Sequence, residues 1–372
     1  MRIALFSGNY NYVREGANQA LNRLVARGLE NGHKFRVYSP VTDTPAFEPA
    51  GDLVPVPSIA LPVRSEFRLA PRLPRRVRED VARFAPDLVH VSTPDILGTR
   101  AQTFAKRLGV PIVASMHTRF ETYFEHYGLG WATPLAEAHL RRFYRRSDHV
   151  LAPTPGIVEE LKLLRGDHRV SLWSRGVDRE LFAPERRDQS WRRAQGWRDD
   201  DTVVLFFGRL VLEKGVRDYV AIVQRLRARG IAARPLIVGA GPAGAVFEVL
   251  GDAVLTGHVD GPELARAIAS ADILIHPSRT EAFGNVVLEA MASGLAIVSA
   301  DTDSSRQLIE PGRSGVLCAA DPEAFAAEVG PLVADAARRR ELGAEAHAAS
   351  GRFSWSAASD SVLDAYRSLV RP

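Results

Sequence analysis

Short apolar segments alternate with amphipathic segments along the whole chain, and this alternation limits the folds open to it. In the first half, strand-like runs such as RIALFS (2–7) and PIVASMH (111–117) are separated by stretches of helical periodicity. The pattern starts again at TVVLFFG (202–208) and continues to LAIVSAD (295–301). Strands that are apolar on both faces and alternate with helices are typical of parallel sheets covered on both sides. The sequence therefore predicts an α/β protein with two Rossmann-like domains.

The length supports two domains, because 372 residues exceed what one hydrophobic core usually fills. The polar, charged segment 175–201 lacks clean periodicity, so we place the boundary there. We predict a first domain over 1–180, completed by a terminal helix at 356–372, and a second domain over 181–355. Ligands of open parallel sheets bind beyond the carboxyl ends of the strands. Two such domains would face each other across a cleft that holds the active site.

Several classes of protein do not fit the composition. The single cysteine, Cys318, excludes an intramolecular disulfide framework and fits a reducing cytosol. No apolar stretch approaches the roughly 20 residues that span a bilayer, and the N-terminal apolar run is too short for a signal peptide. No helix-turn-helix, zinc-finger or RNP-like pattern is present, so we expect no nucleic-acid partner. We expect a cytoplasmic protein whose membrane contact, if it has one, is peripheral.

Positive charge is concentrated in the first domain. Residues 1–180 hold 26 Lys and Arg against 19 Asp and Glu, whereas the remainder holds 22 against 25. Seven arginines lie between positions 64 and 83, with three acids. One interpretation is a solvated helix; the other is a basic surface that docks on anionic lipid. The candidate docking residues are Arg64, Arg68, Arg72, Arg75 and Arg76.

The segment EAFGNVVLEAMASG (281–294) predicts a helix with an acid at each side of its start. Asn285 can cap the helix and Gly294 can end it. The first amides of such a helix favour an anion such as a phosphate. Glu281 would then bond neutral hydroxyls beside the phosphate, and Glu289 would accept hydrogen bonds from a cis-diol such as ribose. The alternative is a surface helix with two unrelated acids.

Three further segments lie at the ends of predicted strands. FFGRLVLEKG (206–215) places Arg209 and Lys214 on a loop, a pair suited to a diphosphate, although helix-capping charges are the alternative. IVGAGP (237–242) is a glycine turn without the third glycine of the dinucleotide fingerprint. The DTD of residues 301–303 matches a metal-binding pattern superficially, and we interpret it as loop acids.

Together, EAFGNVVLEAMASG, GRLVLEKG, VGAGP and the early REGAN loop resemble the retaining glycosyltransferases of family 4, over essentially the whole chain. HTRFETYFEHYGLGW (117–131) and LWSRGVD (172–178) suggest the bacterial and plastid enzymes that glycosylate lipids, namely the sulfoquinovosyl-, mannosyl- and glucosyl-diacylglycerol synthases and their relatives. The resemblance implies a GT-B fold whose terminal helix crosses back onto the first domain. It also implies a nucleotide-sugar donor, a UDP- or GDP-sugar, and a lipid acceptor.

The resemblance implies roles for individual residues. Glu281 would bind the donor sugar, Glu289 the ribose, and Arg209 with Lys214 the departing diphosphate. His117 would lie beside the donor sugar and the acceptor, so the implied catalytic set is His117, Glu281, Arg209 and Lys214. The remaining donor contacts would come from Gly16, Gly239, His258, Phe283, Gly284, Asn285, Val286 and Val287.

The implied mechanism is front-face attack with retention, in which a donor phosphate oxygen accepts the proton of the acceptor. Fixed cationic groups would replace a divalent metal, so the family implies neither a metal nor a cofactor. Two loops depart from the family pattern: TDSSRQLIEPG (302–312), where relatives carry a glycine pair and an acid, and REGAN, with one glycine where relatives often have two. The sugar and the acceptor therefore stay open.

Three alternatives remain at this point. The same transfer could use a polysaccharide, lipopolysaccharide or soluble acceptor. A nucleotide-sugar 2-epimerase shares the double-Rossmann architecture but would need more acid/base candidates than His117. A sugar-nucleotide-binding protein without activity is the third alternative. The presence of Arg209, Lys214, Glu281 and Glu289 together argues against it.

Overall fold

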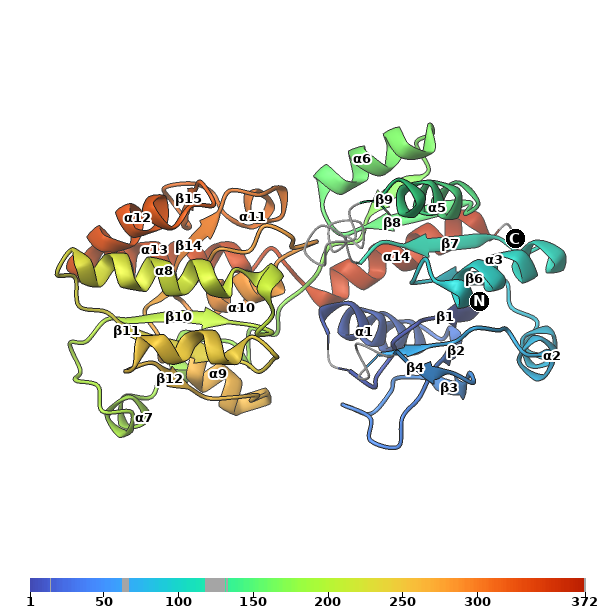
Figure 1. Cartoon of the computed structure of the whole chain (residues 1–372). Helices are drawn as coiled ribbons and strands as arrows, with labels where there is room; N and C mark the ends of the chain where they lie inside the picture. Colours follow the sequence, from blue (N-terminus) through green and yellow to red (C-terminus); the bar gives the residue numbers. More distant parts are fainter. Residues whose placement is uncertain (14, 62–66, 118–130, 132, 371–372) are drawn as a thin grey trace. The chain divides into compact units, whose positions relative to one another are not determined.

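The computed structural model describes residues 1–13, 15–61, 67–117, 131 and 133–370 (Figure 1). The chain divides into two compact units. Unit 1 comprises Met1–Gly176 together with Trp355–Pro372, and unit 2 comprises Val177–Ser354. Each unit is built on its own parallel sheet and is described separately below.

Unit 1 contains a seven-stranded parallel sheet with the order β3-β2-β1-β6-β7-β8-β9. Its strands are β1 (Arg2–Phe6), β2 (Lys34–Ser39), β3 (Asp52–Pro55), β6 (Leu88–Val91), β7 (Ile112–Ser115), β8 (His149–Ala152) and β9 (Val170–Leu172). A separate antiparallel pair joins β4 (Ile59–Ala60) to β5 (Arg68–Leu69). The helices are α1 (Gly16–Glu30), α2 (Arg75–Phe84), α3 (Ile96–Leu108), α5 (Thr133–Arg145), α6 (Pro155–Arg165) and α14 (Trp355–Leu369).

Helices α1 and α14 lie side by side although they are more than 300 residues apart in the sequence (Figure 1). The expected apolar positions of α14 enter the core of unit 1, where Val362, Leu363 and Tyr366 are buried. Arg27 of α1 donates two hydrogen bonds of 2.8 and 2.9 Å to Asp360 of α14. Residues 355–369 are therefore an integral part of unit 1, as expected for the terminal helix.

Unit 2 contains a six-stranded parallel sheet with the order β12-β11-β10-β13-β14-β15. Its strands are β10 (Val203–Phe207), β11 (Arg234–Val238), β12 (Val254–Leu255), β13 (Ile273–His276), β14 (Ala296–Ala300) and β15 (Val316–Cys318). The helices are α7 (Gln189–Ala194), α8 (Val216–Ala228), α9 (Gly261–Ala269), α10 (Asn285–Ala292), α11 (Asp303–Leu308), α12 (Pro322–Ala334) and α13 (Ala336–Ser350). Three 3₁₀ turns are η3 (Pro184–Arg186), η4 (Leu212–Lys214) and η5 (Gly244–Leu250).

Both faces of the unit 2 sheet are buried, which explains its uniformly apolar strands. Val203 and Leu205 of β10 enter one core cluster with residues of α9 and α10. The alternate residues Val204 and Phe206 enter a second cluster with residues of α8 and α12. Because successive side chains of a strand point to opposite faces, helices cover this sheet on both sides. The predicted parallel α/β architecture is confirmed in both units.

The sequence placed two helix starts incorrectly. The first helix begins at Gly16, inside the REGAN segment, where Glu15 and Asn18 form a reciprocal capping box around the helix start. Gly16 thus opens helix α1 and does not lie in a loop. In α10 the capping position belongs to Gly284, with φ of 98°, and Asn285 is already helical. The predicted end is confirmed, since Gly294 follows α10 in the left-handed conformation.

In the described part of the chain, no helix is both long and apolar enough to cross a membrane.

Candidate functional site

The candidate site of unit 2 lies where the strand order reverses. Strand β10 is central, and the chain runs outward from it to β11 and β12 before it returns to the other side as β13. The loops that follow β10 and β13 therefore leave the same edge of the sheet as neighbours. Ligands of open parallel sheets bind in such a crevice, beyond the carboxyl ends of the strands.

An ion pair joins these two loops. Lys214 Nζ donates a 2.6 Å hydrogen bond to Glu281 Oε1, and the two side chains are 26% and 14% exposed. The hydroxyl of Thr280 also donates to the carbonyl oxygen of Glu213, at 3.3 Å. The structure thus brings together one of the two expected diphosphate-binding residues and the expected sugar-binding acid.

Glu281 is held ionised by its surroundings. Burial alone would raise its pKa, but the charge of Lys214 and a hydrogen bond from His276 outweigh burial and hold the pKa well below its usual value. His276 Nε2 lies 3.5 Å from Glu281 Oε1, and its other nitrogen lies 3.2 Å from Ser299 Oγ. Glu281 is therefore a carboxylate at neutral pH, suited to accept hydrogen bonds and not to donate a proton.

The start of α10 offers unpaired hydrogen-bonding groups beside this ion pair. Among the described residues, nothing accepts a hydrogen bond from the backbone amides of Asn285, Val286 or Val287. The amide of Leu288 is the next along the helix, and it donates to the carbonyl oxygen of Gly284. Unpaired amides and the helix dipole both favour an anion at this end.

Two buried side-chain oxygens near this helix start also lack partners. Asn285 Oδ1 and Ser278 Oγ are buried without a hydrogen-bond partner in the described structure. Buried polar atoms in folded proteins are almost always satisfied, so such orphans indicate an absent ligand or solvent. Together with the free amides, they mark the α10 start as a site for a polar, anionic ligand.

Glu289 follows Asn285 by four residues in α10. It therefore lies one turn further along the helix and on the same face. Its carboxyl group has no ion-pair or hydrogen-bond partner among the described residues. Burial raises the pKa of Glu289 to about 8. The two acids of the segment therefore differ: Glu281 is ionised, while Glu289 holds its proton at neutral pH until a donor of hydrogen bonds stabilises its charged form.

The glycine turn after β11 packs on the loop after β10, backbone against backbone. A Cβ atom on Gly239 would lie 1.9 Å from the carbonyl oxygen of Gly208. The amide of Leu210 donates to the carbonyl oxygen of Ala240 at 3.0 Å, which locks the two loops together. Gly239 thus fixes the loop that carries the half-buried Arg209. His258 is exposed and follows the edge strand β12.

In unit 1, the expected residue His117 lies just beyond β7 and takes part in a buried polar chain. Arg175 donates a 2.9 Å hydrogen bond to His117 Nδ1, and His117 Nε2 lies 2.8 Å from Ser115 Oγ. Ser115 Oγ also lies 2.8 Å from His90 Nε2, and His90 Nδ1 lies 2.5 Å from the hydroxyl of Tyr366 in α14. Both ring nitrogens of His117 are therefore bonded within the protein.

The surroundings of these hydrogen-bonded side chains keep the imidazoles of His90 and His117 neutral. Burial lowers the pKa of His90 to about 3. Burial, followed by the charges of Arg175 and His90, holds the pKa of His117 well below its usual value. Burial also lowers the pKa of Arg175, to about 9, so the guanidinium is still charged at neutral pH. Trp173 packs against this group, with the guanidinium carbon of Arg175 4.9 Å from its ring centre.

The expected docking residues of unit 1 differ in their availability. Arg72, Arg75 and Arg76 are exposed near the start of α2, and Arg75 pairs with Glu79 at 2.6 Å. Arg68 in β5 is half-buried and donates to both the side chain and the backbone of Ser58. Arg64 lies outside the described residues, as does most of the segment 117–131.

The acids of the DTD segment are partnered. Arg306 donates hydrogen bonds of 2.6 and 2.8 Å to the two oxygens of Asp301, and it lies 3.9 Å from Asp303. The guanidinium group of Arg306 is therefore engaged by acids of its own segment. The part of the chain that the structure describes holds no group of three acidic, histidine or cysteine side chains that could bind a metal.

The sequence matches two families that together cover both units. Residues 14–181 match the family described as Glycosyltransferase Family 4, and residues 201–335 match Glycosyl transferases group 1. A GDP-mannose-dependent alpha-mannosyltransferase of Mycolicibacterium smegmatis is 33% identical over 100% of this chain and 98% of its own length. The chain belongs to glycosyltransferase family 4. It is thus an enzyme that transfers a sugar from a nucleotide-sugar.

Other similar proteins agree with this family. A sulfoquinovosyl transferase of Arabidopsis thaliana is 31% identical over 82% of this chain and 61% of its own. An alpha-monoglucosyldiacylglycerol synthase of Acholeplasma laidlawii is 26% identical over 85% and 84%. The solved sucrose-phosphate synthase of Thermosynechococcus elongatus has a TM-score of 0.80 at 19% identity and covers 99% of this chain and 98% of its own. The fold of this glycosyltransferase is therefore GT-B.

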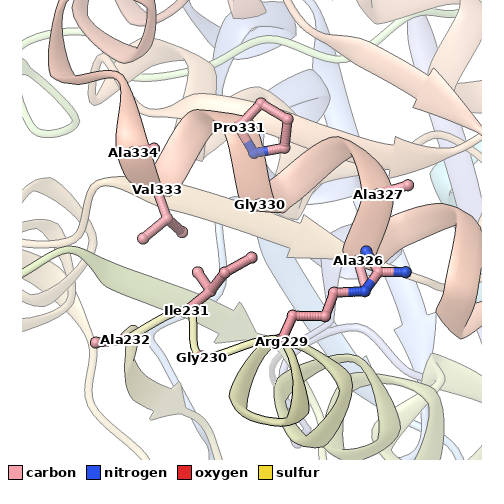
Figure 2. Close-up of a pocket in the computed structure, with 10 residues that line it drawn as sticks. All are labelled: Arg229, Gly230, Ile231, Ala232, Ala326, Ala327, Gly330, Pro331, Val333 and Ala334. Carbon is pink, nitrogen blue, oxygen red and sulfur yellow. The ribbon is translucent and has the colours of Figure 1, made fainter.

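One cavity of this glycosyltransferase lies apart from the candidate site. It has a volume of about 700 Å³ and is lined by apolar side chains such as Ile231 and Val333 together with the stem of Arg229 (Figure 2). It lies between α12 and the segment that joins α8 to the start of β11. That is the amino edge of the sheet, opposite the carboxyl ends where the α10 start lies.

Sequence reasoning missed several partners of the glycosyltransferase's expected residues. His276 and Ser278 lie at the end of the apolar segment DILIHPS (272–278), and their position at the end of such a segment was an available signal. The pairing of Lys214 with Glu281 and the approach of Arg175 to His117 join residues 67 and 58 positions apart. No local pattern indicates such pairs, because only the folded sheet brings them together.

Proposed function

We propose that this glycosyltransferase moves mannose from GDP-mannose to a membrane lipid, with retention of anomeric configuration and without a bound metal. The observation that carries the proposal is the α10 start, where unpaired amides lie between an ionised acid and a protonated one. This arrangement fits a sugar, a diphosphate and a ribose in succession. The choice of GDP-mannose rests on the full-length similarity to the mycobacterial GDP-mannose-dependent mannosyltransferase.

In the proposed complex the diphosphate occupies the start of α10. The amides of Asn285, Val286 and Val287 donate to it, and Arg209 and Lys214 offset its negative charge. Fixed cationic groups and helix amides of this kind stabilise a leaving phosphate through charge that is already in place. Glu281 accepts hydrogen bonds from sugar hydroxyls, and Glu289 accepts them from the ribose.

The proposed chemical step is attack from the face that the diphosphate leaves. The acceptor hydroxyl forms the new bond to the anomeric carbon as the bond to the phosphate oxygen breaks. The proton of the hydroxyl passes to that phosphate oxygen. No side-chain base is needed, which agrees with a neutral His117 whose ring nitrogens are both bonded.

A lipid acceptor is the favoured choice for two reasons. One relative is named as a diacylglycerol glycolipid synthase. In addition, Arg72 and Arg76 present exposed positive charge at the start of α2, which attracts anionic lipid. Transfer to a polysaccharide or a soluble acceptor is the second candidate. We do not retain the 2-epimerase, since the similar proteins are named as glycosyltransferases.

The donor is tested by thermal shift and transfer assays with GDP-mannose, UDP-glucose and ADP-glucose in the presence of EDTA. We expect stabilisation and turnover with GDP-mannose alone. Stabilisation that appears only after a divalent metal is added would contradict the metal-free mechanism and return attention to Asp301 and Asp303. The anomeric coupling of the product by NMR reports retention or inversion.

The acceptor surface is tested by co-sedimentation with anionic vesicles at low salt. We expect the protein to bind, and the double variant Arg72→Glu/Arg76→Glu to lose both binding and transfer to lipid. Arg340→Glu, an exposed arginine of unit 2, is the matched control. If the protein ignores the vesicles and the double variant keeps its activity on lipid, the soluble or polysaccharide acceptor becomes the better proposal.

A further inference from the structure

The buried chain of hydrogen-bonded side chains that runs from Arg175 through His117, Ser115 and His90 to Tyr366 fixes the protonation of His117 as well as its position. Its five members come from four separate parts of unit 1: β6, β7 with the residue just beyond it, the segment after β9, and α14. His90, Ser115 and Tyr366 are fully buried, and Arg175 is 3% exposed. Buried polar groups must be satisfied, so the direction of each hydrogen bond in this chain can be worked out.

The direction is set at one end by Arg175. A guanidinium group only donates, so His117 Nδ1, at 2.9 Å, must accept and cannot carry a proton. A neutral imidazole then carries its hydrogen on Nε2, which donates to Ser115 Oγ at 2.8 Å. Turning the ring over would place carbon atoms at both contacts and lose both hydrogen bonds.

The direction continues beyond Ser115. Its hydroxyl accepts from His117, so its own hydrogen can be given to His90 Nε2, and His90 Nδ1–H then donates to Tyr366. Either direction leaves one hydroxyl hydrogen without a partner among the described residues: that of Ser115 if the second half runs the opposite way, and that of Tyr366 if it runs this way. Hydrogen bonds that run the same way polarise one another, which favours a single direction throughout.

We propose that Arg175, Ser115, His90 and Tyr366 are positioning residues that hold His117 as a neutral imidazole with its proton on Nε2. Helix α14 takes part through the hydroxyl of Tyr366. His117 then presents a fixed, uncharged ring edge, and it neither donates nor accepts a proton during turnover. This assignment goes beyond the proposed function and does not depend on which donor or acceptor is used.

The test is the tautomeric state of the histidines in the full-length protein, labelled with ¹⁵N-histidine and observed by long-range ¹H–¹⁵N NMR at pH 7. Among the described residues, the charged and aromatic groups that face His117 are Arg175, His90 and the indole of Trp173. We expect the proton of His117 on Nε2 and that of His90 on Nδ1. A proton on Nδ1 of His117, or a charged His117 ring, would overturn the proposal. Since no substrate is present, this result is separate from the test of the donor.

Variants test the linkage along the chain. Ser115→Ala should shift the ring signals of both histidines and lower kcat about fivefold, the effect of one lost hydrogen bond, with KM for the nucleotide-sugar unchanged. Ser115→Thr keeps the hydroxyl and should restore both. Tyr366→Phe should shift His90 and, to a smaller extent, His117. Tyr219→Phe removes an equally buried hydroxyl in unit 2 and is the control. If Ser115→Ala and Tyr366→Phe leave both rings as Tyr219→Phe does, the chain does not position His117.

Discussion

At the residue scale, Glu281 and Glu289 show how two acids of one short segment acquire opposite properties. Lys214 and His276 surround Glu281 and lower its pKa, whereas Glu289 has only burial, which raises its pKa to about 8. The sequence shows the two acids as a pair, but it does not show that their pKa values shift in opposite directions. It depends on which loop the sheet places beside each carboxyl group.

The first prediction concerns the acid stability of the protein. Glu281 has a folded pKa below its ordinary value of 4.5, so its contribution to stability is present above about pH 4.5 and is lost as the pH falls towards the folded pKa. We expect the free energy of unfolding of unit 2, measured in urea, to fall less steeply between pH 5 and pH 3 in Glu281→Gln than in the wild type. Glu263→Gln, an exposed acid of α9, serves as the control and should follow the wild type.

The second prediction concerns Glu289 and the nucleotide. Its folded pKa is raised, so its stabilising effect is present below about pH 4.5 and is lost as the pH rises through about 8. Hydrogen bonds from a ribose would stabilise the carboxylate, so GDP binding at pH 7 should release up to one proton. Calorimetry in two buffers of different ionisation enthalpy measures this release.

The matched variants separate the two acids. Glu289→Gln should abolish the proton release, and Glu289→Ala should weaken GDP binding by about tenfold, or about 1.4 kcal/mol. Glu281→Ala should mainly lower turnover. Proton release that persists unchanged in Glu289→Gln would assign it to another group and contradict the ribose role.

At the element scale, the positions of the strands could be predicted well and the contacts between loops could not. Periodicity and apolar content located β1, β7, β10, β14 and α10 within a few residues, because buried strands are apolar throughout. The start of α10 was misjudged, since Asn285 is a common capping residue while Gly284 holds the position through its positive φ. Hydrogen-bond partners such as His90 and Tyr366, 276 positions apart, follow from the tertiary structure alone.

The third prediction concerns the contact between the loops after β10 and β11. Gly239→Ala would place a methyl group against the backbone of Gly208, so the loop that carries Arg209 must move. We expect a loss of about 3 kcal/mol in the stability of unit 2 and weaker GDP binding. Gly251→Ala also has a positive φ but meets no atom within 4 Å, and should cost about 1 kcal/mol with GDP binding retained. Equal effects of the two variants would show that backbone strain, and not the clash, dominates.

At the scale of the whole molecule, one unit is continuous in sequence and the other is discontinuous. Unit 2 is one continuous segment, Val177–Ser354, whereas unit 1 needs a second segment that begins at Trp355. The side chains of Val362, Leu363 and Tyr366 fill the core of unit 1, so that core is incomplete without α14. The units should therefore differ in their ability to fold alone.

The fourth prediction follows from this difference. A fragment of residues 177–354 should unfold cooperatively and bind GDP, because its core and the α10 start are complete. A fragment of residues 1–176 should bind a hydrophobic dye and lack a cooperative transition until a peptide of residues 355–370 is added. Circular dichroism and dye fluorescence measure both outcomes. A stable, cooperative 1–176 fragment would mean that α14 contributes far less than its buried side chains indicate.

The discontinuity of unit 1 also sets an order of events on the ribosome. Domains generally fold as they emerge, the N-terminal one first. Here the segment that leaves the exit tunnel first must wait for residues 355–369, which are translated only after all of unit 2. For that interval the apolar side chains of unit 1 that pack against α14 are uncovered in the nascent chain. The half that is begun first is thus the half completed last, and it is the one expected to engage chaperones during synthesis.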